Sequence, residues 1–233
     1  MTVRPQDIQN EKLSGWSKAA EKARLRREFL AGRNALPQGT VESLSRAVLR
    51  RIWALRAVRE MEARKRVGET VWLSCYVDFD REVRTRPLMC KALERGYRLA
   101  VPVVPPGREG GLILSEVKDV PGSREPGSGW VRSRWGLFEP RDPRPVEPGR
   151  MDCFVIPGVV FDRRGFRLGF GKGYYDGLLA SARTDAWRIG LAFSSQLAGR
   201  LPRAEWDVPM HRIVTESGVV RCNPIGGVFP IRR

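Results

Sequence analysis

The residues best suited to do chemistry lie together between Arg167 and Asp176. This segment reads Arg-Leu-Gly-Phe-Gly-Lys-Gly-Tyr-Tyr-Asp, so three glycines alternate with larger residues. Because glycine has no Cβ atom, backbone N–H groups in such a loop can approach a ligand closely. If the loop leads into a helix, these N–H groups form an anion site, to which Arg167 and Lys172 add positive charge. Asp176 adds a carboxylate of the kind that binds Mg²⁺. We interpret the segment as a phosphate-binding loop.

The spacing of the glycines differs from that of the two commonest phosphate motifs. The Walker pattern needs four residues between its glycines and a lysine followed by serine or threonine. The dinucleotide pattern needs a third glycine three residues after the second, whereas Gly169, Gly171 and Gly173 alternate. On spacing alone, a solvated glycine-rich turn remains an alternative. The concentration of N–H donors, cations, aromatic rings and a carboxylate in one segment favours phosphate binding.

Strands and helices that alternate along the chain are expected to position this loop. An apolar run at 153–157 predicts a buried strand before it, and 173–182 predicts a helix after it. Further strands are predicted at 71–77, 97–104, 112–117, 187–193 and 213–215, and helices at 16–36, 41–58 and 87–95. This alternation predicts an α/β sandwich with a mostly parallel sheet. Ligands bind such sheets at the carboxyl ends of the strands, where the loops after Val77, Val104 and Ile156 should open.

We expect a single domain. Residues 16–222 carry all the predicted elements, with no internal repeat and no clear linker. Residues 1–15 are polar and are predicted to be a flexible N-terminus, and 223–233 an irregular C-terminal tail. Residues 118–150 contain many prolines and glycines, which predicts a long surface excursion of a kind that is often functional.

Composition narrows the class of protein. No apolar run reaches the roughly 20 residues of a spanning helix, and the polar N-terminus lacks the apolar region of a signal peptide. We therefore expect a cytoplasmic protein with no membrane partner. The four cysteines are widely spaced without a Cys-x-x-Cys pair, which argues against a disulfide framework. With His211 as the single histidine, a zinc site or a histidine-activated nucleophile is not expected.

The net charge of +16 is the unusual bulk property, and 35 of the 42 basic residues are arginine. One interpretation is nucleic-acid binding, for which a basic patch would be the footprint. The other is attraction of a polyanionic small substrate. The arginines are spread along the whole chain without an RNA- or DNA-binding motif, so we do not expect nucleic acid to be the main partner.

Taken together, these segments resemble the 5-formyltetrahydrofolate cyclo-ligase family, also called methenyltetrahydrofolate synthetases. The strongest match is the stretch 157–176, Pro-Gly-Val-Val-Phe-Asp-Arg-Arg-Gly-Phe-Arg-Leu-Gly-Phe-Gly-Lys-Gly-Tyr-Tyr-Asp. Weaker matches follow in family order at 22–26, 82–87, 135–140, 206–209 and 214–216, so the resemblance covers most of the chain. It implies a three-layer α/β/α sandwich of the NagB/RpiA-like kind and an enzyme that we expect to be a monomer.

The resemblance implies a reaction as well. The family closes 5-formyltetrahydrofolate to 5,10-methenyltetrahydrofolate, with ATP as co-substrate, Mg²⁺ as cofactor, and ADP and phosphate as products. The formyl oxygen attacks the γ-phosphate, N10 of the folate captures the resulting imino-phosphate, and phosphate leaves. Phosphoryl transfer depends mainly on positioning and charge neutralisation rather than on a protein nucleophile. The excess of arginine would suit a polyglutamylated reduced folate, whose tail carries several carboxylates.

The resemblance assigns roles to individual residues. The residues expected to bind ATP are Lys22, Arg26, Arg167, Leu168, Gly169, Phe170, Gly171, Lys172, Gly173, Tyr174 and Tyr175. Those expected to bind the folate are Val77, Glu82, Trp135, Phe170, Gly171, Lys172, Gly173 and Tyr174. Lys172 and Arg167 are the expected catalytic residues, and Asp176 and Asp207 correspond to magnesium ligands. Trp135 and the two tyrosines could stack on the flat rings of the folate. The segment 78–81 reads Asp-Phe-Asp-Arg, where bacterial members more usually have Pro-Phe-Gly-Gly.

Each of these assignments has a plainer alternative. A basic helix face that carries Lys22 and Arg26 is often only solvated, and Glu82 could be an exposed loop residue. Asp176 could begin a helix, Asp207 could sit in a turn, and Trp135 could be packed. Two other functions also stay open. One is a paralogue that retains nucleotide binding but acts as a regulatory or RNA-associated binding protein. The other is a sugar-phosphate isomerase or transferase on a related fold.

Overall fold

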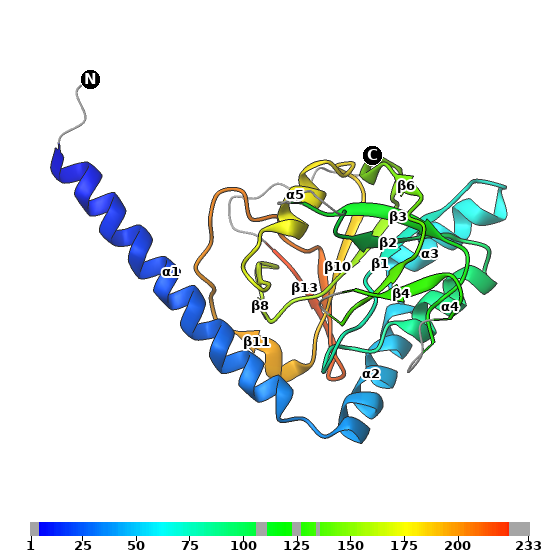
Figure 1. Cartoon of the computed structure of the whole chain (residues 1–233), viewed down its shortest axis with the longest axis horizontal. Helices are drawn as coiled ribbons and strands as arrows, with labels where there is room; N and C mark the ends of the chain where they lie inside the picture. The colour runs from blue at the N-terminus through cyan, green and yellow to red at the C-terminus, as the bar shows by residue number, and fades with distance from the viewer. Residues whose placement is uncertain (1–4, 106–110, 123–126, 134–135, 224–233) are drawn as a thin grey trace.

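A computed structural model describes residues 5–105, 111–122, 127–133 and 136–223, with the side chains of the first helix described from residue 17 onward (Figure 1). The helices are α1 (Pro5–Asn34), α2 (Gln38–Ile52), α3 (Arg56–Arg66), α4 (Arg86–Glu94) and α5 (Tyr174–Ala180), with short 3-10 turns η1 (Pro148–Arg150) and η2 (Ser194–Gln196). None of the described helices is long and apolar enough to cross a membrane.

An eight-stranded sheet forms the centre of the described structure. Its strands, in spatial order, are β13 (Val219–Arg221), β12 (Arg212–Val214), β10 (Trp187–Leu191), β7 (Cys153–Ile156), β1 (Trp72–Cys75), β2 (Arg98–Val103), β3 (Ile113–Val117) and β6 (Pro145–Val146). The five central strands pair in parallel, and β13, β3 and β6 join antiparallel at the two edges. In one register, Leu73 of β1 lies beside Cys153 of β7. The predicted mostly parallel α/β sheet is confirmed.

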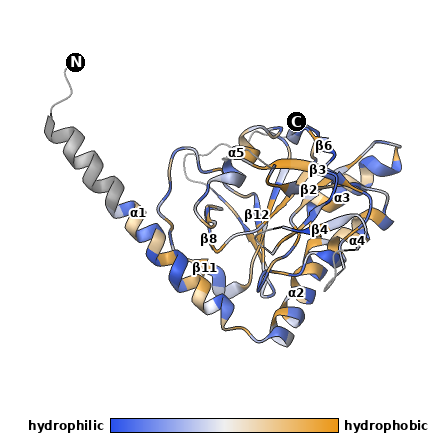
Figure 2. Cartoon of the chain, in the orientation of Figure 1, coloured by the Kyte–Doolittle hydropathy of each residue, from blue (hydrophilic) through white to orange (hydrophobic). Residues whose placement is uncertain are grey.

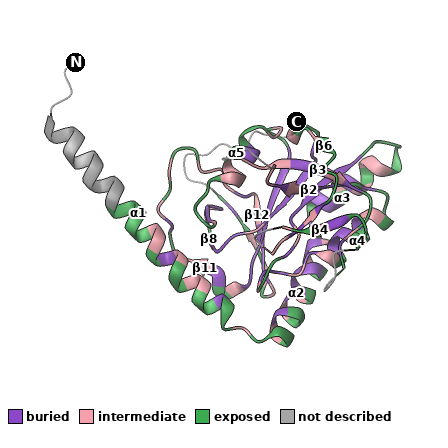
Figure 3. Ribbon diagram, viewed as in Figure 1, coloured by how far each residue is buried: buried purple, intermediate pink, exposed green. Residues whose placement is uncertain are grey.

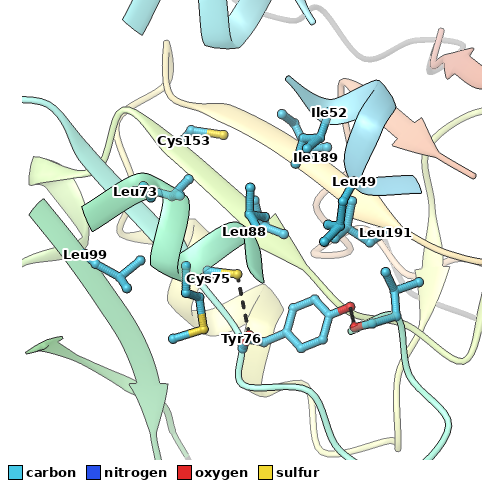
Figure 4. Packing of buried hydrophobic residues seen from close by; sticks show 14 of the residues in the cluster. Leu49, Ile52, Leu73, Cys75, Tyr76, Leu88, Leu99, Cys153, Ile189 and Leu191 are labelled. Atoms are coloured by element: carbon cyan, nitrogen blue, oxygen red, sulfur yellow. Dashed lines mark hydrogen bonds between the residues drawn. The ribbon is translucent and has the colours of Figure 1, made fainter. Parts of the chain in front are cut away.

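Helices cover one face of the sheet almost completely. The strands β1 and β7 are buried along their whole length, and apart from Ser74 of β1 their residues are apolar, as in strands covered on both faces. Figure 4 shows side chains of this face, which are Leu49, Ile52 and Leu88 from α2 and α4, and Leu73, Cys75, Leu99, Cys153, Ile189 and Leu191 from the strands. In Figure 2 apolar residues concentrate in these central strands, and Figure 3 shows the same strands as buried. This core fixes the orientation of the loops at the strand ends.

The opposite face has a mixed cover. The short helix α5 packs there through Leu178 and Leu179, against Phe154 and Ile156 of the sheet. A separate three-stranded sheet joins it, with β8 (Val160–Asp162) between β11 (Leu197–Ala198) and β9 (Arg167–Leu168). The predicted sandwich therefore has a complete helical layer on one side and one helix with a small sheet on the other. The NagB/RpiA-like detail stays a prediction.

The part of α1 that follows Lys22 packs on this small sheet. Leu25 and Phe29 of α1 lie in one apolar cluster with Leu168 of β9 and Leu201. Figure 1 shows α1 passing beside β8 and β11 before the chain turns into α2. The helix α1 therefore packs against the β8–β9 hairpin, from which the predicted phosphate-binding loop follows.

Several boundaries differ from the predictions. The helix α1 begins at Pro5 rather than near residue 16, and the predicted helix at 41–58 is two helices, because Leu55 adopts an extended conformation between α2 and α3. The excursion at 118–150 contains a hairpin of β4 (Trp130–Arg132) and β5 (Phe138–Pro140). The single domain, the flexible start and the tail stay predictions, and residues 1–4 and 224–233 lie outside the described residues.

Candidate active site at the glycine loop

The glycine loop emerges from the β8–β9 hairpin and leads into α5. Leu168 is buried against α1, so its side chain anchors the loop, whereas the chain from Phe170 to Gly173 is exposed. Gly171 and Gly173 have φ values of +98° and +67°, in the left-handed region that glycine adopts without strain. The path of the backbone therefore explains Gly171 and Gly173, and the predicted order of strand, loop and helix is confirmed.

Two cations of α1 reach the loop region from the same face of the helix. The Nε atom of Arg26 donates a 2.8 Å hydrogen bond to the carbonyl oxygen of Gly169. Its guanidinium also lies against Gly171, where an added Cβ atom would be 3.5 Å from the Arg26 Cζ atom. One turn earlier, the Nζ atom of Lys22 lies 3.3 Å from Oδ2 of Asp207. As predicted, Lys22 and Arg26 share one face of α1. Arg26 contacts the glycine loop, and Lys22 contacts Asp207 in the segment before β12.

Arg167 is buried beneath the loop and joins it to the segment before β12. Its Nη2 atom donates to Oδ1 of Asp176 at 3.1 Å, and its Nη1 atom donates to the carbonyl oxygen of Val208 at 3.1 Å. The N–H of Val208 in turn donates to Oδ1 of Asp176 at 3.2 Å. Burial lowers the pKa of Arg167, and the adjacent Asp176 carboxylate opposes that shift. Arg167 therefore holds the Asp176 carboxylate in position, both directly and through Val208.

Asp176 and Asp207 have the chemistry of a magnesium site. Oδ1 of Asp176 is bonded to Arg167 and Val208, and Oδ2 of Asp207 accepts from Lys22 and from the N–H of Ala204. The second oxygen of each carboxylate accepts no hydrogen bond from the described residues. Within those residues no cluster of three or more metal-binding side chains exists. Two carboxylates suit Mg²⁺ when phosphate and water oxygens complete its shell, so the residues present fit the ion.

The loop also presents a free cation and several aromatic rings. Lys172 is exposed, and its ammonium makes no hydrogen bond or ion pair with the described residues. Phe170 is exposed beside it, whereas Tyr174 and Tyr175 are half-buried at the start of α5. Burial raises the pKa of the Tyr175 phenol, which favours its neutral form. Lys172 is therefore the cation of this loop most available to an incoming anion.

Glu82 lies in a buried recess at the carboxyl ends of β1, β7 and β10, so its interpretation as an exposed loop residue is wrong. It is 8% exposed, and its Oε2 atom accepts the N–H of Phe79 at 3.1 Å. Its Oε1 atom lies 3.6 Å from Nη1 of Arg33. Burial raises the pKa of Glu82 to about 7, and the Arg33 charge opposes that shift. A buried carboxylate of this kind can accept hydrogen bonds from a ligand.

Arg33 is a functional candidate that the sequence analysis missed. It is 2% exposed, and two of its guanidinium nitrogens, Nε and Nη1, have no hydrogen-bond partner among the described residues. The recess that it shares is lined by Arg33, Tyr76, Glu82, Val83, Pro157, Gly158, Leu191 and Gln196. A signal was present, since Lys22, Arg26 and Arg33 fall at positions i, i+4 and i+11, which lie on one face of a helix.

The unusual segment at 78–81 is closed by its own hydrogen bonds. Asp78 is buried, and its carboxylate accepts the N–H of Thr85 at 3.0 Å and Nη1 of Arg86 at 2.7 Å. Asp80 has a φ of +50°, a conformation that aspartate tolerates better than most residues. With Asp-Phe-Asp-Arg at 78–81, the loop is therefore closed by hydrogen bonds and holds Glu82 in place through the N–H of Phe79.

A groove of about 450 Å³ lies on the outer side of this loop. It is lined by Gln38, Glu42, Asp78, Phe79, Asp80, Arg84, Arg86, Pro87, Arg132, Gly136 and Phe138. The guanidinium groups of Arg86 and Arg132 lie 5.4 and 4.9 Å from the centre of the Phe138 ring. Trp135, a predicted folate contact, lies outside the described residues, and Val77 is partly buried against the core. The groove therefore combines apolar surface with three arginines and three carboxylates.

A prediction follows from the burial of Glu82. Its pKa of about 7, against an ordinary 4.5, means that the folded protein binds this proton more tightly. Its contribution to stability is therefore complete below pH 4.5 and is lost as the pH rises through 7, a difference of roughly 3 kcal/mol. Relative to Glu82→Gln, the free energy of unfolding of the wild type should fall between pH 5 and pH 8. Urea titrations of both proteins measure this, and a constant difference would contradict it.

These features define an α/β protein with a glycine loop that leads into α5 and a buried carboxylate at the carboxyl ends of its central strands. The sequence model of the 5-formyltetrahydrofolate cyclo-ligase family matches residues 18–216, and the chain belongs to this family of ligases. The 5-formyltetrahydrofolate cyclo-ligase of Escherichia coli K12 is 35% identical over 150 residues, which cover 63% of this chain and 79% of the relative. That of Mycolicibacterium smegmatis is 31% identical over 203 residues, 85% of this chain and 96% of the relative.

Solved structures agree with this assignment. The structure of Aquifex aeolicus 5,10-methenyltetrahydrofolate synthetase superposes with a TM-score of 0.69 at 29% identity, covering 91% of this chain and 94% of that one. The structure of the Mycoplasma pneumoniae 5,10-methenyltetrahydrofolate synthetase, at 23% identity and a TM-score of 0.64, supports the fold. The resemblance inferred from the sequence is confirmed, and neither a binding-only paralogue nor a sugar-phosphate enzyme is favoured.

Proposed function

We propose that this protein uses ATP to close 5-formyltetrahydrofolate to 5,10-methenyltetrahydrofolate, releasing ADP and phosphate. One observation carries the proposal beyond family membership. A single face of α1 contacts both halves of the site, since Arg26 bonds the glycine loop and Arg33 faces Glu82 in the recess. A phosphate-binding loop and a buried carboxylate suited to a pterin are thereby held on the same side of the sheet.

The proposed chemistry needs positioning rather than a protein nucleophile. The formyl oxygen attacks the γ-phosphorus of ATP, and the bond to the bridging oxygen breaks so that ADP leaves with the electron pair. N10 then attacks the activated carbon and loses its proton, and inorganic phosphate departs. The backbone of the glycine loop, with Lys22 and Arg26, would orient the triphosphate, and Lys172 would neutralise charge that develops on the transferred group.

Asp176 and Asp207 would hold Mg²⁺ through the carboxylate oxygens that the described residues leave free. When bound, the ion would neutralise charge on the phosphates of ATP. Arg167 would then keep Asp176 in place from below, since it bonds Oδ1 and leaves Oδ2 available. Lys22, which contacts Asp207 at 3.3 Å, lies where it could transfer its contact to a phosphate oxygen.

Glu82 would accept two hydrogen bonds from the amino group and ring N–H of the pterin. Donors of this kind favour the ionised carboxylate, so binding would draw the raised pKa of Glu82 back toward its ordinary value. Val77, Trp135, Tyr174 and the loop residues from Phe170 to Gly173 would complete the folate site. The groove beside the loop 78–81 would extend the folate site outward.

We further propose that the folate carries a polyglutamate tail that lies along the groove. Arg84, Arg86 and Arg132 line it together with Glu42, Asp78 and Asp80, and Arg84 and Arg86 both contact Asp78. A carboxylate of the tail would take up guanidinium groups of this set, which match a carboxylate with two parallel hydrogen bonds. Each added glutamate should lower the Michaelis constant for the folate, more at low salt than at high salt because exposed charges are screened. Steady-state kinetics with one to five glutamates measure this, and an unchanged constant would contradict the tail site.

The test of the function is optical. Purified protein mixed with 5-formyltetrahydrofolate should develop the methenyl-folate absorbance band only when MgATP is present, with one ADP formed for each folate closed. No absorbance change, from folded protein that still binds ATP, would overturn the proposal in favour of a nucleotide-binding paralogue.

We propose that the protein acts as a cytoplasmic monomer, which suits its four free cysteine thiols.

A further inference from the structure

We propose that Trp206 is the stacking platform for the nucleobase of the bound nucleotide. This inference rests on the proposed use of ATP and adds a residue to the ATP site that the predicted set does not contain. The site would take a purine base flat against the indole ring, with the phosphates directed toward the glycine loop.

The exposure of Trp206 is the first observation. Its side chain is 75% exposed, although tryptophan is among the most buried residues on average. The described chain has few other exposed large apolar residues, which are Val67, Phe79, Phe170 and Val219. An exposed aromatic ring of this size offers a flat face on which a nucleobase can stack.

The turn that carries Trp206 is held in place. The N–H of Ala204 donates to Oδ2 of Asp207 at 2.8 Å, and the N–H of Asp207 donates to the carbonyl oxygen of Ala204 at 3.3 Å. These two bonds close the turn on both sides of the tryptophan. The indole is therefore presented from a fixed backbone, which lowers the entropy lost when a base stacks on it.

The same turn adjoins the phosphate site. Asp207, the next residue, contacts Lys22 of α1 at 3.3 Å, and Val208 bonds both Asp176 and Arg167. Consecutive Cα atoms are about 3.8 Å apart, so the indole begins within two residues of groups that contact both α1 and the loop. A nucleotide whose phosphates occupy the loop could place its base on Trp206.

A nucleobase fits this position better than a protein partner does. Each base offers a flat π-face that stacks on an aromatic ring, whereas a stable protein contact needs a broad apolar area. Trp206 is a single exposed ring beside charged residues, since Glu205 and Asp207 flank it in the sequence and Lys22 contacts Asp207. Because an indole face reads no hydrogen-bonding edge, ATP and GTP should differ little at this contact.

The experiment compares binding of two ligands that share phosphates and differ in the base. Calorimetry would measure the affinity of MgADP and of magnesium tripolyphosphate for wild type, Trp206→Ala, Trp206→Phe and the control Val67→Ala, which removes an equally exposed side chain elsewhere. We expect Trp206→Ala to weaken MgADP by roughly tenfold or more and to leave tripolyphosphate unchanged. Trp206→Phe should retain most of the affinity, and Val67→Ala all of it.

The outcomes that would overturn the inference are distinct. Unchanged MgADP affinity in Trp206→Ala, or an equal loss for MgADP and tripolyphosphate, would reject a base contact while leaving the ATP-dependent function intact. A wild type that binds neither ligand would reject the proposed function together with this inference. Thermal unfolding of each variant checks that the loss is local, as expected for an exposed side chain.

Discussion

Replacing Lys172 with alanine should lower turnover at saturating substrates by roughly 100-fold or more, with little change in folate affinity. The reason is that the ammonium is exposed and unpaired among the described residues, so its charge is available to the transferred phosphoryl group. Removing one group that stabilises charge in the transition state costs about 10²- to 10³-fold in rate. Single-turnover kinetics and equilibrium folate binding together measure the two quantities.

The control for this prediction is Lys118→Ala, which removes an exposed lysine from outside the predicted site. It should leave turnover and binding at the wild-type values, so a general effect of lowering the net charge is separated from the local one. If Lys172→Ala weakened folate binding as much as it slowed turnover, Lys172 would belong to general anion binding rather than to catalysis.

The second large effect concerns stability. Asp162→Asn should lower the free energy of unfolding by about 3 to 5 kcal/mol, because it unbalances a buried ionic network. Asp162 is 0% exposed, and its carboxylate accepts the N–H groups of Arg164, Phe166 and Leu201 and two guanidinium nitrogens of Arg164. An amide in its place would turn an NH₂ group toward these donors.

Urea unfolding of Asp162→Asn measures this loss. Asp185→Asn is the matched control, since Asp185 also pairs with an arginine two residues away, at 3.0 Å, but its side chain is 52% exposed. Exposed ion pairs contribute about 0 to 1 kcal/mol, so this variant should differ little from wild type. Equal stability of the two variants would show that the Asp162 network is not what holds the β8–β9 turn.

The central fold could be predicted because its strands are buried on both faces. The runs around Leu73, Phe154 and Ile189 are mostly apolar, with Ser74 and Arg188 as the polar exceptions, and such runs are typical of parallel strands covered on both sides. The glycine loop could also be predicted, since Gly171 and Gly173 take φ values that few other residues adopt. The break between α2 and α3 could not, because no proline or glycine marks it and the packing of Leu55 against the core determines it.

The site was predicted less completely, and for a physical reason. Motifs identify residues whose type is unusual, and Arg33 is one of 35 arginines. Its helical spacing from Lys22 and Arg26 indicates the face of α1 on which it lies, but only the packing of α1 in the folded chain buries its guanidinium beside Glu82. Trp206 likewise begins one of the weaker family matches, at 206–209, and only its exposure in the folded chain distinguishes it. The Arg167 contacts with Asp176 and Val208 also depend on long-range folding that no local pattern contains.

The placement of α1 has a consequence for how the two substrates influence each other. Residues 22 and 33 are roughly 16 Å apart along the helix axis, and a helix of this length transmits displacement as a stiff rod. A nucleotide that draws Lys22 and Arg26 toward its phosphates would move Arg33 against Glu82 as well. The two binding events then share a coupling free energy, and reciprocity requires that each substrate change the affinity for the other by the same factor.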